Sequence, residues 1–186
     1  SRTADEWSAG RLQLLLCAGC VFGCGWRSRL PVFDVQRIVL VDSWWSSVIV
    51  GRSVATLAEL CFVAQWALLL RHAAHDTGSR LALGVADALL PLIAVAELCS
   101  WHAVLTTSNL GHAIEESLWG LCAASIALGL LAIWPRVRPQ QRPLLAFWCA
   151  AAAVYVAYMF AVDVPMYWAR WLADEVQGRV YLSLLQ

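Results

Sequence analysis

The segment AELCSWHAVLTTSNLGHAIEESLW, residues 96–119, holds a short polar turn between apolar runs and carries three glutamates and two of the four histidines of the chain. The apolar residues on either side continue far enough for helices that cross a bilayer, which takes about 20 mostly apolar residues. Residues 106–111 have the small and hydrogen-bonding side chains of a turn and a helix cap. The segment therefore predicts a membrane-spanning helical hairpin that carries ionisable side chains.

The composition supports a membrane protein. Of 186 residues, 61% are hydrophobic and 14% are charged, and the mean hydropathy is +0.65. Soluble domains are roughly half apolar and about a quarter charged. The formal net charge is zero, so no basic field points to nucleic acid as a partner. The seven cysteines all lie in apolar runs, which argues against a disulfide framework in the loops.

Five apolar stretches predict the fold, although the first of them is short for a crossing. The chain is expected to be a single integral membrane domain, residues 1–186, of the all-α class, forming a polytopic transmembrane helical bundle. Two amphipathic segments, residues 30–42 and residues 166–186, are predicted to lie at the membrane interface before the second span and after the fifth. The predicted spans are residues 12–26, 44–70, 81–106, 113–134 and 144–164.

The arginines predict an orientation. If the last four spans alternate in direction, the loops at residues 71–80 and 135–143 share one face, and together they hold five arginines. The turn at residues 107–111 faces the other side and holds none. Because basic loops stay on the cytoplasmic side, the two arginine-bearing loops are predicted to face the cytoplasm or its organellar equivalent.

Ionisable residues inside the spans predict a polar pocket on the opposite side. Arg52 and Glu59 lie on one helical face, and so do His112 and Glu116. Placing a charged side chain near the bilayer centre costs about several kcal/mol, so such a residue is expected to have a partner and to mark a functional site. Charges nearer the boundary have a simpler interpretation, since Asp163 and Arg170 can lie at the headgroup level. In the same way, Glu115 and Glu116 can complement a helix N-terminus. The predicted catalytic groups are Glu97, His102, His112 and Glu116, with Arg52, Asp163 and Arg170 orienting a substrate.

Three kinds of chemistry fit these residues. Carboxylates and histidines that point inward from several helices can hold a divalent metal ion, although the Glu-x-x-His order of di-iron bundles is missing here. Two histidines on neighbouring spans can instead ligate haem or a chlorophyll-type pigment. A histidine beside a buried carboxylate can also act as a general acid or base without a cofactor. The tentative metal ligands are Glu59, Glu97, His102, His112 and Glu116.

The leading functional prediction is a membrane-embedded enzyme that acts on a lipid or another hydrophobic substrate. One alternative is a non-catalytic subunit of a larger membrane complex, such as an energy-converting assembly, in which buried charges pair across helices. A second alternative is a proton-coupled transporter whose buried glutamates titrate during the cycle. The expected partners are the lipid bilayer and either other membrane subunits or further copies of the chain.

Overall fold

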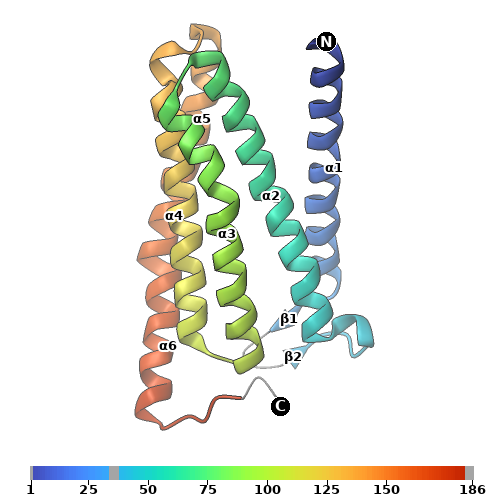
Figure 1. Ribbon diagram of the computed structural model, residues 1–186. Helices are drawn as coiled ribbons and strands as arrows, with labels where there is room; N and C mark the ends of the chain where they lie inside the picture. The colour runs from blue at the N-terminus through green and yellow to red at the C-terminus, as the bar shows by residue number, and fades with distance from the viewer. Residues whose placement is uncertain (1, 34–37, 183–186) are drawn as a thin grey trace.

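The computed structural model describes residues 2–33 and 38–182, with the side chains of residues 10–32 and 38–182, and shows an elongated bundle of helices (Figure 1). The described chain is all-α apart from one pair of two-residue strands. The elements are α1 (Arg2–Arg29), β1 (Val32–Phe33), β2 (Ile38–Val39), α2 (Val48–Thr77), α3 (Arg80–Thr106), α4 (Asn109–Ile133), α5 (Arg142–Tyr158) and α6 (Val164–Val176). A π-helical turn at Met159–Asp163 joins α5 to α6.

The predicted polytopic helical bundle is confirmed. Within the described residues, four helices are long and apolar enough to cross a membrane: Val48–Thr77, Arg80–Thr106, Asn109–Arg136 and Pro139–Val176. The first predicted span lies inside α1, which has 28 residues and runs antiparallel to α2 along its side (Figure 1). Helix α1 is longer than the predicted span because it continues past Arg11 at its N-terminal end.

Serine caps and left-handed residues divide the chain into helical hairpins. Ser47, Ser79 and Ser108 precede α2, α3 and α4, and each hydroxyl oxygen accepts a hydrogen bond from a backbone N–H of the first turn. Gly78 caps the C-terminal end of α2 and Thr107 caps that of α3, and both residues adopt the left-handed conformation. Each connection is therefore two residues long, which makes α2, α3 and α4 antiparallel neighbours.

The segments flanking the last four spans take particular forms. Residues 30–42, predicted to lie at the interface, contain the antiparallel pair β1–β2 with Val32 opposite Val39; residues 34–37 lie outside the described part. Most of the predicted loop at residues 71–80 is helical, because α2 continues to Thr77. The amphipathic segment after the fifth span continues that span as α6. Beyond Gly178 the chain turns back, and the Leu182 N–H donates to the Thr106 carbonyl at 3.2 Å.

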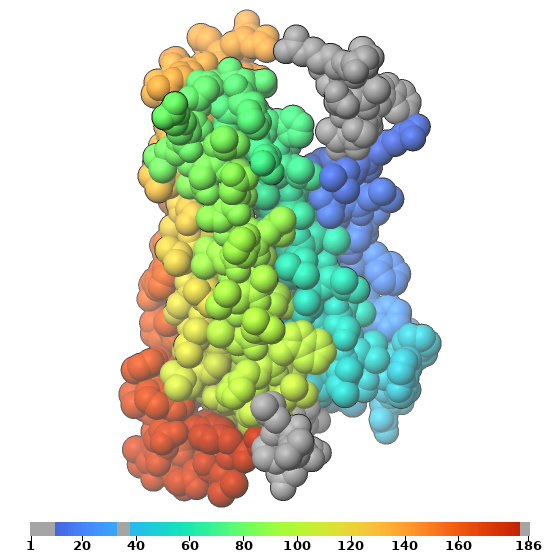
Figure 2. All heavy atoms as spheres, in the orientation of Figure 1, coloured from blue at the N-terminus to red at the C-terminus, as the bar shows by residue number. Residues whose placement is uncertain are grey.

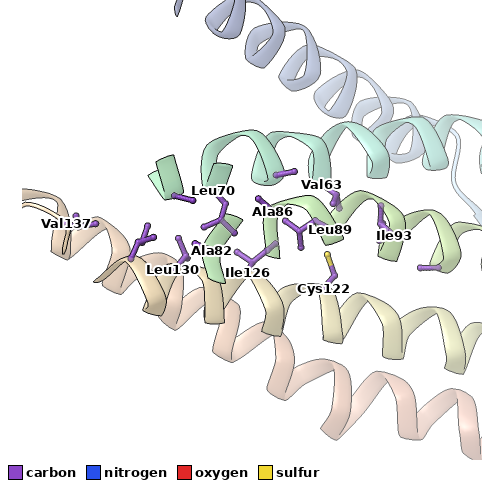
Figure 3. Packing of buried hydrophobic residues seen from close by; sticks show 14 residues of the cluster. Val63, Leu70, Ala82, Ala86, Leu89, Ile93, Cys122, Ile126, Leu130 and Val137 are labelled. Atoms are coloured by element: carbon purple, nitrogen blue, oxygen red, sulfur yellow. The ribbon is translucent and has the colours of Figure 1, made fainter. Parts of the chain in front are cut away.

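The core lies between α2, α3 and α4. Its members are small or branched apolar side chains that lie close to fully buried (Figure 3). Helix α4 approaches α3 closely at Gly111, where a Cβ would lie 2.7 Å from the Cβ of Ala103. Helices α5 and α6 bury no side chain fully, as expected for helices whose outer faces meet lipid. The labelled core residues are Val63, Leu70, Ala82, Ala86, Leu89, Ile93, Cys122, Ile126, Leu130 and Val137.

The two ends of the bundle differ in charge. The α2–α3 turn and the α4–α5 connection lie at the end where α1 begins (Figure 1). We call this the basic end, because it carries Arg71, Arg80, Arg136, Arg138 and Arg142. The α3–α4 turn, the strand pair and the returning C-terminal segment lie at the other end, the hairpin end. A space-filling view shows α2 and α3 packed side by side along the bundle (Figure 2).

Candidate functional site

A buried arginine organises the polar residues of the bundle. Arg52, near the start of α2, has a side chain only 5% exposed and contacts three carboxylates. Its Nη2 atom lies 3.1 Å from Glu59 Oε2 and 2.5 Å from Glu97 Oε2. Its Nη1 atom lies 3.4 Å from Glu115 Oε1. Three helices therefore direct carboxylates at the two terminal nitrogens of one guanidinium group, while its buried Nε atom has no hydrogen-bond partner among the described residues.

Hydrogen bonds from α2 and α3 hold this arrangement. The Thr56 hydroxyl donates to Glu97 Oε2 at 2.5 Å, and the Trp101 indole N–H donates to the Thr56 oxygen at 3.1 Å. Thr56 lies one helical turn from Arg52, so its hydroxyl shares the inward face of α2. The carboxylate of Glu97 is thus oriented by two side chains of α2, which rigidifies the packing of α2 against α3.

His112 and Glu115 form a dyad on the first turns of α4. His112 Nδ1 lies 3.0 Å from Glu115 Oε2, and both side chains are more than nine-tenths buried. The imidazole ring stacks on Tyr167, with ring centroids 5.1 Å apart. Because an ionised carboxylate only accepts hydrogen bonds, Nδ1 is the donor in this pair, and in a neutral imidazole Nε2 is then the acceptor nitrogen. Within the described residues, the buried Nε2 atom has no hydrogen-bond partner.

Two contiguous cavities adjoin these residues. The polar chamber has a volume of about 320 Å³ and the apolar chamber about 510 Å³, each within the range of small-molecule sites. Both are lined by Glu59, Trp119 and Tyr155, so the apolar chamber lies directly beside the charged groups. The polar chamber is otherwise lined by Arg27, Arg52, His112, Glu115, Glu116 and Tyr167. The apolar chamber includes Cys20, Phe62, Val63, Trp66, Cys122, Ala123, Trp148 and Ala152.

The structure brings together most, but not all, of the predicted site residues. Arg52, Glu59 and Glu97 meet directly, and His112 joins them through Glu115. Glu116 lines the polar chamber, and within the described part of the chain it has no ion-pair partner.

Three predicted residues lie apart from this group. His102 lies on the exposed face of α3. Arg170 is exposed, with its guanidinium 5.6 Å from the Tyr167 ring centroid. Asp163 is part-exposed in the π-helical turn. Neither Asp163 nor Arg170 lines the polar chamber, so the substrate-orienting role expected of them has no support from their positions.

Glu115 is a member of the candidate site that the sequence pattern did not predict. Its expected role was to complement the N-terminus of α4, yet its side chain is 6% exposed and contacts both Arg52 and His112. The separation of three residues between His112 and Glu115 is the signal that could have identified the dyad. Arg27, whose Nη1 atom lies 3.6 Å from Glu59 Oε1, was also missed, because it lies on α1 and had no apparent partner in the sequence.

The predicted metal ligands do not form a ligand set. Among the residues that the structure describes, no three histidine, cysteine or acidic side chains are placed to hold a metal ion. Glu59 and Glu97 direct carboxylate oxygens at Arg52, while His102 lies outside the cluster. The expectation of a divalent metal held by this set therefore finds no support in this geometry, whereas ligation of haem or a chlorophyll-type pigment by a histidine stays a prediction.

The C-terminal segment ties α6 to the hairpin end. The amide nitrogen of the buried Asn109 donates to Asp174 Oδ2 at 2.6 Å, and Arg179 Nη1 lies 2.9 Å from the same oxygen. These contacts hold α6 against the start of α4. Tyr167, which stacks on His112, lies two turns earlier on α6, so this clamp also positions one wall of the polar chamber.

Comparison of the chain with protein-family models, with curated proteins and with solved structures finds no match.

Proposed function

We propose that the protein is a membrane-embedded enzyme that acts on a lipid or another hydrophobic substrate by acid–base chemistry. The observation that carries this proposal is that an apolar chamber and a polar chamber lie side by side and share Glu59, Trp119 and Tyr155 as lining residues. An amphiphile can place its apolar part in the apolar chamber while its polar group enters the polar chamber beside His112. Ligand sites commonly combine such an apolar wall with a few convergent polar groups.

His112 is the proposed proton-transfer group. The carboxylate of Glu115 fixes the ring and its tautomer, as orienting carboxylates do in other acid–base sites. Arg52 contacts the second oxygen of Glu115, so we assign Arg52 to positioning this carboxylate. This differs from the substrate clamp expected from the sequence. Glu116 lines the same chamber and is the proposed second acid–base group.

The proposed orientation places the basic end in the cytoplasm or its organellar equivalent. The two arginine-bearing connections lie at one end of the bundle (Figure 1), which is the arrangement that the positive-inside rule requires. The polar chamber lies in the half of the bundle nearer the hairpin end. Its substrate would then enter from the non-cytoplasmic leaflet.

A subunit of a larger complex is the principal alternative. In that case the buried charges would only join helices, and the apolar faces of α1 and α5 would contact other subunits. A charge cluster with this purely structural role needs no adjoining chamber. We favour the enzyme, because Glu116 and His112 both line the chamber. Within the described part of the chain, the Glu116 carboxylate has no ion-pair partner and the buried His112 Nε2 atom has no hydrogen-bond partner.

The test is conversion of a natural substrate by purified protein. The protein in lipid nanodiscs is incubated with an extract of membrane lipids and other hydrophobic molecules, which is then compared by mass spectrometry with an untreated extract. We expect at least one species to be consumed, and its rate to fall about 100-fold or more in His112→Ala. The matched control is His72→Ala, which changes an exposed histidine of α2 at the basic end. An extract left unchanged, or equal rates for wild type and a folded His112→Ala protein, would contradict the proposal.

A further inference from the structure

The charges around the polar chamber are unbalanced. Two arginines, Arg27 and Arg52, face four glutamates in and directly behind its wall, which leaves two formal negative charges when the imidazole is neutral. Both arginines already contact carboxylates. Arg27 contacts Glu59, and Arg52 contacts Glu59, Glu97 and Glu115. An anionic headgroup would therefore meet like charge, which costs binding free energy, whereas a cationic group would offset the imbalance.

The free carboxylate of the chamber lies among aromatic rings. Glu116 has no ion-pair partner within the described residues, and Trp119, Tyr155 and Tyr167 line the same chamber. Aromatic faces attract organic cations through their quadrupoles, most strongly where water is excluded. A carboxylate together with three aromatic side chains therefore forms a chemically suitable binding site for an ammonium group.

The buried His112 side chain favours a cation that carries an N–H group. Its side chain is 8% exposed, its Nδ1 atom is engaged by Glu115, and its Nε2 atom is buried without a partner in the described chain. A buried acceptor that lacks a donor carries a desolvation penalty. An ammonium N–H donated to Nε2 would remove that penalty, and a quaternary ammonium group could not do so because it has no N–H.

We propose that the amphiphile of this site is a long-chain amine, bound as its ammonium form. Its N–H groups are donated to the Glu116 carboxylate and to His112 Nε2, the aromatic rings enclose the nitrogen, and the alkyl chain occupies the apolar chamber. This inference rests on the proposed function, because it names the substrate class of the same site. It also assigns specificity to Glu116 in addition to the role already proposed for it.

Four amphiphiles with one alkyl chain and different headgroups test the inference. Hexadecylamine, hexadecyltrimethylammonium, hexadecanol and hexadecanoate are titrated against the purified protein, and bound ligand is measured by native mass spectrometry. We expect the amine to bind about tenfold or more tightly than the alcohol and the carboxylate, as one additional charge-assisted contact allows. The quaternary cation should bind more weakly than the amine.

Variants locate the preference at the chamber. Glu116→Gln keeps the shape of the side chain and should abolish the preference for hexadecylamine over hexadecanol. Tyr167→Leu, which removes one ring, should weaken amine binding independently. Glu175→Gln, which changes an exposed carboxylate of α6, is the matched control and should bind the amine as wild type does.

The outcomes separate this inference from the proposed function. Equal binding of hexadecanol and hexadecylamine, with no effect of Glu116→Gln, would overturn the amine assignment and leave an amphiphile site intact. Equal binding of the amine and the quaternary cation would overturn the N–H requirement assigned to His112. Failure of all four amphiphiles to bind would contradict the amphiphile site itself, and with it the proposed function.

Discussion

Arg52 shows how one residue can hold several helices of a membrane protein in register. Its guanidinium lies between carboxylates from α2, α3 and α4, namely Glu59, Glu97 and Glu115. A planar group with five N–H donors suits this role, because several acceptors can approach it from different directions. The ion pairs compensate charges that would otherwise be unpaired in a medium with little water. Positioning of the His112 dyad depends on the same guanidinium, through Glu115.

Removing this charge should destabilise the bundle strongly. Arg52→Gln leaves Glu97 and Glu115 without a cation and Glu59 with Arg27 alone, and we expect the free energy of unfolding to fall by about 3–5 kcal/mol. The matched control is Arg71→Gln, because the Arg71–Asp87 pair is more than half exposed on both sides and should contribute about 0–1 kcal/mol. Unfolding in mixed micelles by titration with sodium dodecyl sulfate measures both. Equal losses in the two variants would refute the organising role of Arg52.

Sequence patterns predict part of this arrangement of ionisable residues around Arg52. The spacing of Arg52 and Glu59 predicts a polar face on α2, and in the structure the Arg52 Nη2 atom donates to Glu59 Oε2 on this face. The three-residue separation of His112 and Glu115 places both side chains on one face of α4. The sequence does not show in which direction that face points, because it does not give the rotation of α4 about its axis. That rotation is set by side-chain packing between helices, and here it directs Glu115 at Arg52.

At the scale of the elements, the close approach of α3 and α4 sets the geometry of the site. The two-residue connection fixes the two helices as neighbours, and Gly111 lets their backbones approach near the turn. Small residues at such crossings are the usual basis of helix packing in membranes. Because His112 follows Gly111 directly, a change in the spacing of α3 and α4 would also displace the dyad.

Two glycine variants test this element. Gly111→Ala would bring its Cβ to 3.0 Å from the Cα of Ala103, so the α3 backbone must move, and we expect a loss of about 1–3 kcal/mol. Gly84→Ala is the matched control, since nothing lies within 4 Å of a Cβ added at Gly84 of α3. That change should be neutral or stabilise by about 0.5–1 kcal/mol. Thermal unfolding monitored by circular dichroism should rank the Gly111 variant lowest, and the reverse order would show that the approach is not tight.

The sequence predicted the existence of the helices better than the form of their flanking segments. Apolar length indicates a span directly, because a bilayer requires it. The boundaries depend on local features such as the serine caps and the left-handed Gly78 and Thr107. Hydropathy alone carries none of this information, so the helical continuation of α2 to Thr77 and the β1–β2 pair at residues 30–42 appeared only in the structure.

For the whole molecule, the arrangement of α1, α2, α3, α4 and the continuous α5–α6 helix predicts on which side of the membrane each end of the chain lies. If α1 crosses with the other four helices, the N-terminal end lies at the basic end and the C-terminal end at the hairpin end (Figure 1). In sealed inverted vesicles, whose cytoplasmic face is outside, protease should remove an epitope tag fused to the N-terminal end and spare one fused to the C-terminal end. Removal or protection of both tags would show that α1 does not cross.

The contiguous apolar and polar chambers are the central feature of the whole molecule, and photolabelling tests their occupancy most directly. The protein in nanodiscs is irradiated with an alkyl amphiphile that carries a diazirine on its chain, and modified residues are mapped by mass spectrometry. We expect labels at Trp119, Ala123 and Ala152, which line the apolar chamber, and we expect these labels to be lost when excess unlabelled amphiphile competes. Labels confined to lipid-facing residues such as Leu14 and Leu98, both at least 70% exposed, and unaffected by the competitor would contradict this expectation.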